Sequence, residues 1–202
     1  METDSTKKGA KMNLPFFKYY RIPLILAVSL SLVIITYKSN ILLENANVMS
    51  YLNILGIFVG AILGIFILDL DYFIHTFLLE PKSEVSNTIK TYIKDKDILG
   101  AFNYIILHAD QFENKTLNSL VFQVALSIFS MLIVIDPGVP FMIKALVIST
   151  LLNTIFRFYY FYLQGFGDDW FWILKKVPNK YVVLVINLIV LIFVGISVHT
   201  LK

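Results

Sequence analysis

Residues 45–68 read NANVMSYLNILGIFVGAILGIFIL and carry no charged side chain. A helix that crosses the hydrocarbon core of a bilayer needs about 20 mostly apolar residues. This stretch is long enough, so it predicts a transmembrane helix over residues 48–68. Such a helix decides the fold class, because the lipid interior admits only segments whose backbone groups are hydrogen-bonded within the protein.

The composition of the whole chain agrees with a membrane protein. Hydrophobic residues make up 57% of the 202 residues and charged residues 15%, against about 45–50% and 25% in soluble domains. This composition excludes an ordinary soluble enzyme, and the absence of cysteine excludes a disulfide scaffold. We expect an all-α, polytopic membrane bundle of about five helices. The predicted spans are 22–37, 48–68, 116–135, 139–156 and 181–201.

One of these spans is less secure than the others. Residues 139–156 contain Lys144, and a charged side chain is costly in the middle of a bilayer. A re-entrant hairpin over this segment is therefore the alternative to a crossing helix.

The distribution of lysine and arginine predicts the orientation. Fourteen of the 17 basic residues lie before the first span, between the second and third, or between the fourth and fifth. Because basic residues concentrate on the cytoplasmic side, we expect the N-terminus inside and the C-terminus outside a cell membrane. The low alanine content and the abundance of Ile, Lys and Asn suggest an AT-rich bacterial gene, and hence the bacterial inner membrane.

The chain divides into two predicted parts. Residues 1–21 form a basic cytoplasmic segment, and residues 22–202 form a single transmembrane domain with a cytoplasmic loop over 69–115. Apolar residues recur at helical spacing from Val85 to Ile93 and from Ile98 to Ile106, and Asp97 is placed to cap the second helix. We expect two short amphipathic helices on the cytoplasmic face.

Three glycines lie on one face of the second span. Gly56, Gly60 and Gly64 are spaced by four residues, which allows another helix backbone to approach closely. We interpret this face as helix packing within the bundle. The alternative is a seam for a second copy or for a membrane-protein partner.

Acidic and imidazole side chains follow the same span. Asp71 and His75 are four residues apart and share a helix face, whereas Asp69 points away from Asp71 unless the helix bends near Leu70. Carboxylate and imidazole groups are metal ligands, so one hypothesis is that Asp69, Asp71 and His75 bind one divalent metal ion. The alternative is that the two acids lie at the interface, solvated or paired with lysines.

Other polar residues fall at the same predicted side of the membrane. They are His108, Asp110 and Glu113 before the third span, and Arg157, Asp168 and Asp169 after the fourth. We expect a polar cleft on the cytoplasmic face, with His108 or Asp110 as the general base of a hydrolytic reaction. Polar residues are also simply common at loop ends. The amides Asn118, Gln123 and Asn153 are expected to form hydrogen bonds between helices.

Two stretches resemble a known family. Gly60-Ala61-Ile62-Leu63 and Asp69-Leu70-Asp71-Tyr72 are similar to small bacterial inner-membrane proteins described as metal-dependent hydrolases. That family carries Asp-x-Asp-His after an early span, and later His-Ser…Phe-Gln and His-x-x-x-Asp patterns.

This chain departs from the family at the metal ligands. Tyr72, Asn118 and Asn153 stand where the family has histidine, and Arg157 stands where it has aspartate. Amides are poor ligands for transition metals. The resemblance, which covers residues 60–157 with gaps, therefore implies a member that has lost most of its metal shell.

Three functions remain open from the sequence. The first is a variant or degenerate metal-dependent hydrolase, and the second is a non-catalytic membrane scaffold or a subunit of a larger complex. The third is a small transporter or channel, which lacks the support of an internal repeat. The expected partner is the lipid bilayer, and the small net charge of +3 does not favour a nucleic-acid partner.

Overall fold

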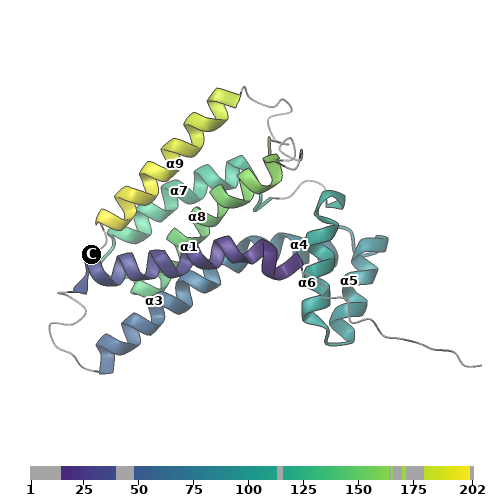
Figure 1. Cartoon of the computed structure of the whole chain (residues 1–202), viewed down its shortest axis with the longest axis horizontal. Coiled ribbons are helices and arrows are strands. Elements are labelled where there is room, and N and C mark those ends of the chain that lie inside the picture. The colour runs from purple at the N-terminus through teal and green to yellow at the C-terminus, as the bar shows by residue number, and fades with distance from the viewer. Residues whose placement is uncertain are drawn as a thin grey trace, which may run out of the picture.

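A computed structural model describes residues 15–39, 48–112, 116–163, 165, 170–171 and 180–200, and the regular structure in these residues is entirely helical (Figure 1). Four helical runs are long and apolar enough to cross a membrane: Phe16–Tyr37, Val48–Leu79, Phe141–Leu163 and Tyr181–Thr200. The predicted all-α membrane fold is confirmed at this level. The sides on which the two termini lie remain a prediction.

The elements follow one another along the chain with few interruptions. The first run is α1 (Pro15–Tyr37), and the second comprises α3 (Val48–Phe66), the 3₁₀ turn η1 (Ile67–Asp69), α4 (Leu70–Ile74) and the π-helical turn η2 (His75–Leu79). They are followed by α5 (Glu84–Lys94), α6 (Ile98–Leu107), η3 (Ala109–Gln111), α7 (Leu120–Ile135), α8 (Phe141–Leu163) and α9 (Lys180–Thr200).

The span that contains Lys144 is one continuous helix. α8 runs for 23 residues from Phe141 to Leu163, so the segment is not a re-entrant hairpin. Lys144 is buried inside the bundle, which removes it from the lipid. Hydropathy alone cannot distinguish a lysine that faces protein from one that faces hydrocarbon.

The predicted span over 116–135 is corrected to a shorter helix. α7 begins at Leu120 and has 16 residues, about 24 Å at 1.5 Å per residue, whereas the hydrocarbon core is about 30 Å thick. The helix begins late because residues 116–118 donate backbone hydrogen bonds to Asp71 and Ser119 caps the helix through Phe122 N. The expected count of about five spans is thus four by length.

Two short helices are present where the sequence predicts them; α5 is amphipathic as expected, whereas α6 is apolar along most of its length. Ser83 caps α5 by accepting from Ser86 N, and Asp97 caps α6 by accepting from Gly100 N at 2.8 Å. The pair lies at one end of the bundle, beside α4 and the start of α1 (Figure 1). The backbone N of Phe16 donates to Asn103 Oδ1 on α6, which fixes α6 to the beginning of α1.

α8 is the central helix of the bundle. It packs against α1 and α3 on one side and against α7 and α9 on the other (Figure 1). Its buried side chains include the polar residues Lys144, Ser149, Asn153 and Arg157. A polar stripe therefore runs along the helix that has the most protein around it, and its last member, Arg157, lies near the end of the bundle that carries α5 and α6.

Candidate functional site: a buried ion pair where α1, α3 and α8 meet

The glycine face of α3 brings α8 close enough to form the site. A Cβ atom at Gly60 would collide with the carbonyl O of Met142, and one at Gly64 would lie 2.5 Å from Leu146 O. A Cβ atom at Gly56 would make a tight contact with the Met142 side chain, 3.3 Å from its Cβ. All three glycines therefore contact α8 of the same chain, and α8 fills the face that the alternative interpretation assigns to a second copy.

Two side chains on α8 bind the backbone of α3 beyond the glycines. Ser149 Oγ donates to Ala61 O at 2.6 Å, and Asn153 Nδ2 donates to Ile65 O at 2.7 Å. These bonds hold the two helices in register up to the point where α3 tightens into the 3₁₀ turn η1. Asn153 is thus an interhelical hydrogen-bond donor, as the sequence predicts.

Asp69 and Arg157 form an ion pair at the end of this interface. Arg157 Nη2 donates to Asp69 Oδ1 at 2.7 Å, and both side chains are buried, with Arg157 fully inaccessible to solvent. Tyr20 on α1 donates its hydroxyl to the other carboxylate oxygen, Oδ2, at 2.6 Å. A buried carboxylate is costly unless it is paired and hydrogen-bonded, and here both of its oxygens have partners.

The guanidinium has further oxygen neighbours. Nη1 lies 3.4 Å from Asn118 Oδ1, and Nη2 lies 3.5 Å from Ile65 O. The ring of Tyr19 lies 5.6 Å from Arg157 Cζ, within the range of a cation–π contact. Arg157 therefore occupies a pocket lined by oxygen atoms and an aromatic face, a position suited to a cation.

The hydrogen-bond partners of Asp71 are different from those of Asp69. Its carboxylate accepts from the backbone N atoms of Thr116, Leu117 and Asn118 at 2.8–3.1 Å, and from Asn118 Nδ2 at 3.1 Å. Asn118 Nδ2 also donates to Leu68 O. Asp71 thus acts as an anchor for the chain that enters α7, and its ligand capacity is largely taken up by these donors.

The remaining predicted ligand lies elsewhere. His75 Nε2 is 3.7 Å from Glu80 Oε1, and its ring packs edge-on against Phe112. Among the described residues, no group of three His, Asp or Glu side chains is placed to hold a metal ion. Asp69, Asp71 and His75 thus face three different environments, and the metal site that the sequence suggests stays a prediction without a common centre in the described part of the chain.

The two candidate general bases are only partly described. His108 is the C-cap residue of α6; its Nδ1 lies 2.9 Å from Tyr104 O and its ring stacks on Tyr104. Asp110 lies in η3, and its side chain is outside the described residues, as are Glu113, Asp168 and Asp169. A catalytic role for His108 or Asp110 therefore remains a prediction.

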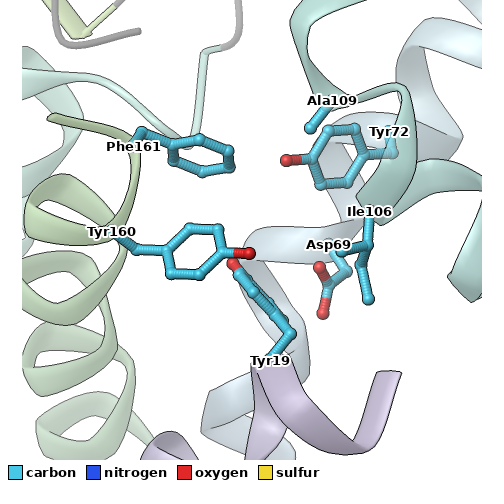
Figure 2. Close-up of a pocket in the computed structure, with 7 residues that line it drawn as sticks. All are labelled: Tyr19, Asp69, Tyr72, Ile106, Ala109, Tyr160 and Phe161. Carbon is cyan, nitrogen blue, oxygen red and sulfur yellow. The ribbon is translucent and has the colours of Figure 1, made fainter. Parts of the chain in front are cut away.

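A small cavity adjoins Asp69 (Figure 2). The Tyr72 side chain points into it from one side and the Tyr19 and Tyr160 side chains lie across from it, while Phe161, Ile106 and Ala109 complete its wall. Its volume is about 10 Å³, about the least that holds one water molecule. A water in this cavity would lie among tyrosine hydroxyls beside the carboxylate, but a substrate of any size would not fit.

Two members of this site were not identified from the sequence. Tyr19 and Tyr20 precede the predicted first span, and nothing in the local pattern distinguishes them from aromatic residues that anchor a helix at the interface. The available signal was their position beside Arg21, just before the apolar run 22–37, which places them at the same depth as the acids after α3.

Comparisons with known proteins identify no relative. No family model, no curated protein and no solved structure matches this chain.

Proposed function

We propose that this chain is a non-catalytic multi-pass membrane protein, a scaffold or subunit in which the guanidinium of Arg157 takes the structural place of a metal cation. The observation that carries the proposal is the 2.7 Å ion pair between buried Arg157 and buried Asp69. Hydrolysis with a metal requires a carboxylate that is free to bind the ion and a position for water and substrate next to it.

The state of the two carboxylates supports this proposal over the hydrolase. Asp69 has Arg157 on one oxygen and Tyr20 on the other. A divalent ion at Asp69 would lie next to the positive charge of Arg157. The two cations would repel each other strongly, because the dielectric constant inside the bundle is low. Asp71 accepts three hydrogen bonds on Oδ2 and one on Oδ1, so a metal ion at either oxygen would compete with donors already in place.

The departures from the hydrolase family fit the same proposal. Asn118 and Arg157 stand at two of the family's ligand positions and here lie within 3.4 Å of each other through Oδ1 and Nη1. If the resemblance reflects kinship, the bundle has kept its packing while a cation supplied by the protein has replaced one supplied by the solvent.

A partner of this scaffold would use the α5–α6 pair. The glycine face is filled by α8, whereas Ile98 and Leu107 on α6 are 53% and 64% exposed. The chain has no cysteine, so a cysteine introduced for crosslinking is the only thiol in the protein. We expect Leu107→Cys to give a discrete crosslinked product in native membranes, and Leu188→Cys, a similarly exposed control on α9, to give none. Equal yields of crosslinked product from the two variants would count against a specific partner surface on α6.

Metal analysis tests the non-catalytic part of the proposal. Protein purified without chelator should contain no stoichiometric Zn²⁺, Mn²⁺ or Mg²⁺, and its unfolding in detergent should be indifferent to added metal or EDTA. One ion per chain that is lost in Asp69→Asn, together with stabilisation by that metal, would support the hydrolase and refute the proposal.

A further inference from the structure

A second cavity lies between the last two membrane helices. It is lined by Phe158, Tyr159 and Tyr162 of α8 and by Tyr181, Val183 and Leu184 of α9, and its volume is about 250 Å³. None of these six residues belongs to the Arg157 site. The cavity is far larger than one water molecule requires, and apart from three tyrosine hydroxyls these six side chains are hydrocarbon.

The walls of this cavity have a buried floor and an exposed rim. Phe158 and Val183 are buried, whereas Tyr159, Tyr162, Tyr181 and Leu184 are between 40% and 67% exposed. Both helices are candidate membrane spans, so an exposed rim on them faces the bilayer. Because Tyr162 is near the end of α8 and Tyr181 near the start of α9, the rim lies at a span end, where tyrosine side chains prefer the headgroup level.

We call this second cavity the groove, and its dimensions decide which molecule it can hold. Its lining covers residues 158–162 of α8, about 7 Å of helix, and only the first turn of α9. A transmembrane partner helix is 10–12 Å wide and packs along much of a hydrocarbon core about 30 Å thick, so it does not match such a short seat. A flexible hydrocarbon chain does, because it can bend and place only the part nearest its headgroup in the groove.

We propose that this groove binds the headgroup-proximal part of one acyl chain of a phospholipid from the surrounding leaflet, with the headgroup at the level of the tyrosine hydroxyls. The hydrocarbon packs on Phe158 and Val183 and is held laterally by Tyr159, Tyr162 and Leu184. The site is independent of the Arg157 cluster and of the scaffold function proposed above.

The chain contains a built-in reporter for this site. Trp170 is buried, and its ring lies 5.6 Å from that of Phe158, the floor of the groove. Only two tryptophans occur in the sequence, and Trp172 is the other. A Trp172→Phe variant therefore reports on Trp170 alone, and bromine atoms on a lipid chain quench tryptophan fluorescence only at close range.

The test uses full-length Trp172→Phe protein in vesicles of phosphatidylcholine brominated on the acyl chain near the headgroup. We expect strong quenching of Trp170, and we expect most of it to be lost when Leu184→Phe fills the groove. Ile192→Phe is the matched control, since Ile192 lies two turns along α9 and is exposed to a similar extent; it should retain the quenching.

Native mass spectrometry in detergent supplies a second readout. The parent protein and Ile192→Phe should retain one phospholipid that Leu184→Phe loses. Equal quenching and equal lipid retention in all three proteins would overturn the proposal, because Trp170 would then sense only the bulk bilayer. Absence of quenching in the parent would overturn it as well.

Discussion

Arg157 on α8 and Asp69 in η1, the turn that follows α3, are 88 residues apart in the sequence and meet at 2.7 Å inside the bundle. The pair joins the two helices that share the glycine interface, and Tyr20 connects it to α1. Three membrane helices thus converge on one carboxylate. A charge pair in such a place is usually either a functional element or a fixed point of the fold, and the saturation of both carboxylate oxygens supports the second role.

The hydroxyl of Tyr20 should contribute measurably to stability. Tyr20→Phe removes a buried hydrogen bond to a charged acceptor, which is worth about 1.5–3 kcal/mol, and should lower the free energy of unfolding in mixed detergent micelles by that amount. Tyr37→Phe is the control, because its hydroxyl bonds to His199 on an exposed surface; its effect should stay within about 0.5 kcal/mol. Equal effects of the two changes would contradict the assigned role of Tyr20.

Asp71 should control the order of the chain that enters α7. Asp71→Ala leaves the amides of residues 116–118 without their acceptor. The penalty, on the order of 1–3 kcal/mol for an unsatisfied buried donor, falls on Asn118, which is buried, whereas Thr116 is exposed. Hydrogen exchange over residues 116–123 should therefore accelerate. In the control, Asp136→Ala, the lost bond is a local one to Gly138 N in an exposed turn, and exchange at 116–123 should not change. Unaltered exchange in Asp71→Ala would show that this anchor is dispensable.

The glycine interface should tolerate no side chain at its centre. Gly60→Ala places a methyl group against the carbonyl of Met142 and should destabilise the bundle by about 1–3 kcal/mol through overpacking. At Gly195 on α9 an added Cβ meets nothing within 4 Å, so Gly195→Ala should be neutral or stabilising by about 0.5–1 kcal/mol. The mass in detergent should be the same for both, whereas a change of oligomeric state in Gly60→Ala would point to an intermolecular role.

Local features of this fold were accessible from the sequence. The cap at Asp97, the two short helices α5 and α6 and the apolar runs depend on residues within one or two turns of each other, and the structure has them. The glycine spacing likewise predicted close packing, although the identity of the partner helix depended on the arrangement in space.

The features that the sequence left open depend on distant residues. α7 starts at Leu120 because Asp71, more than 40 residues earlier, binds the preceding amides. Lys144 lowers the hydropathy of α8, but this helix is surrounded by other helices of the bundle, so the lysine side chain is buried in protein and does not face lipid. For the same reason Asp69 suggested a metal ligand: an acid and aromatic residues follow it in the sequence, whereas its counter-ion, Arg157, comes from α8, 88 residues further along the chain.

A double-mutant cycle on Asp69 and Arg157 tests the central claim most directly. Asp69→Asn or Arg157→Met leaves one buried charge unpaired, and each should cost about 3–5 kcal/mol of unfolding free energy or prevent folding. The double variant has no buried charge at this site, so it should be more stable than either single variant. Additive losses in the double variant, or a nearly neutral Asp69→Asn in a protein that a divalent cation stabilises, would contradict the account.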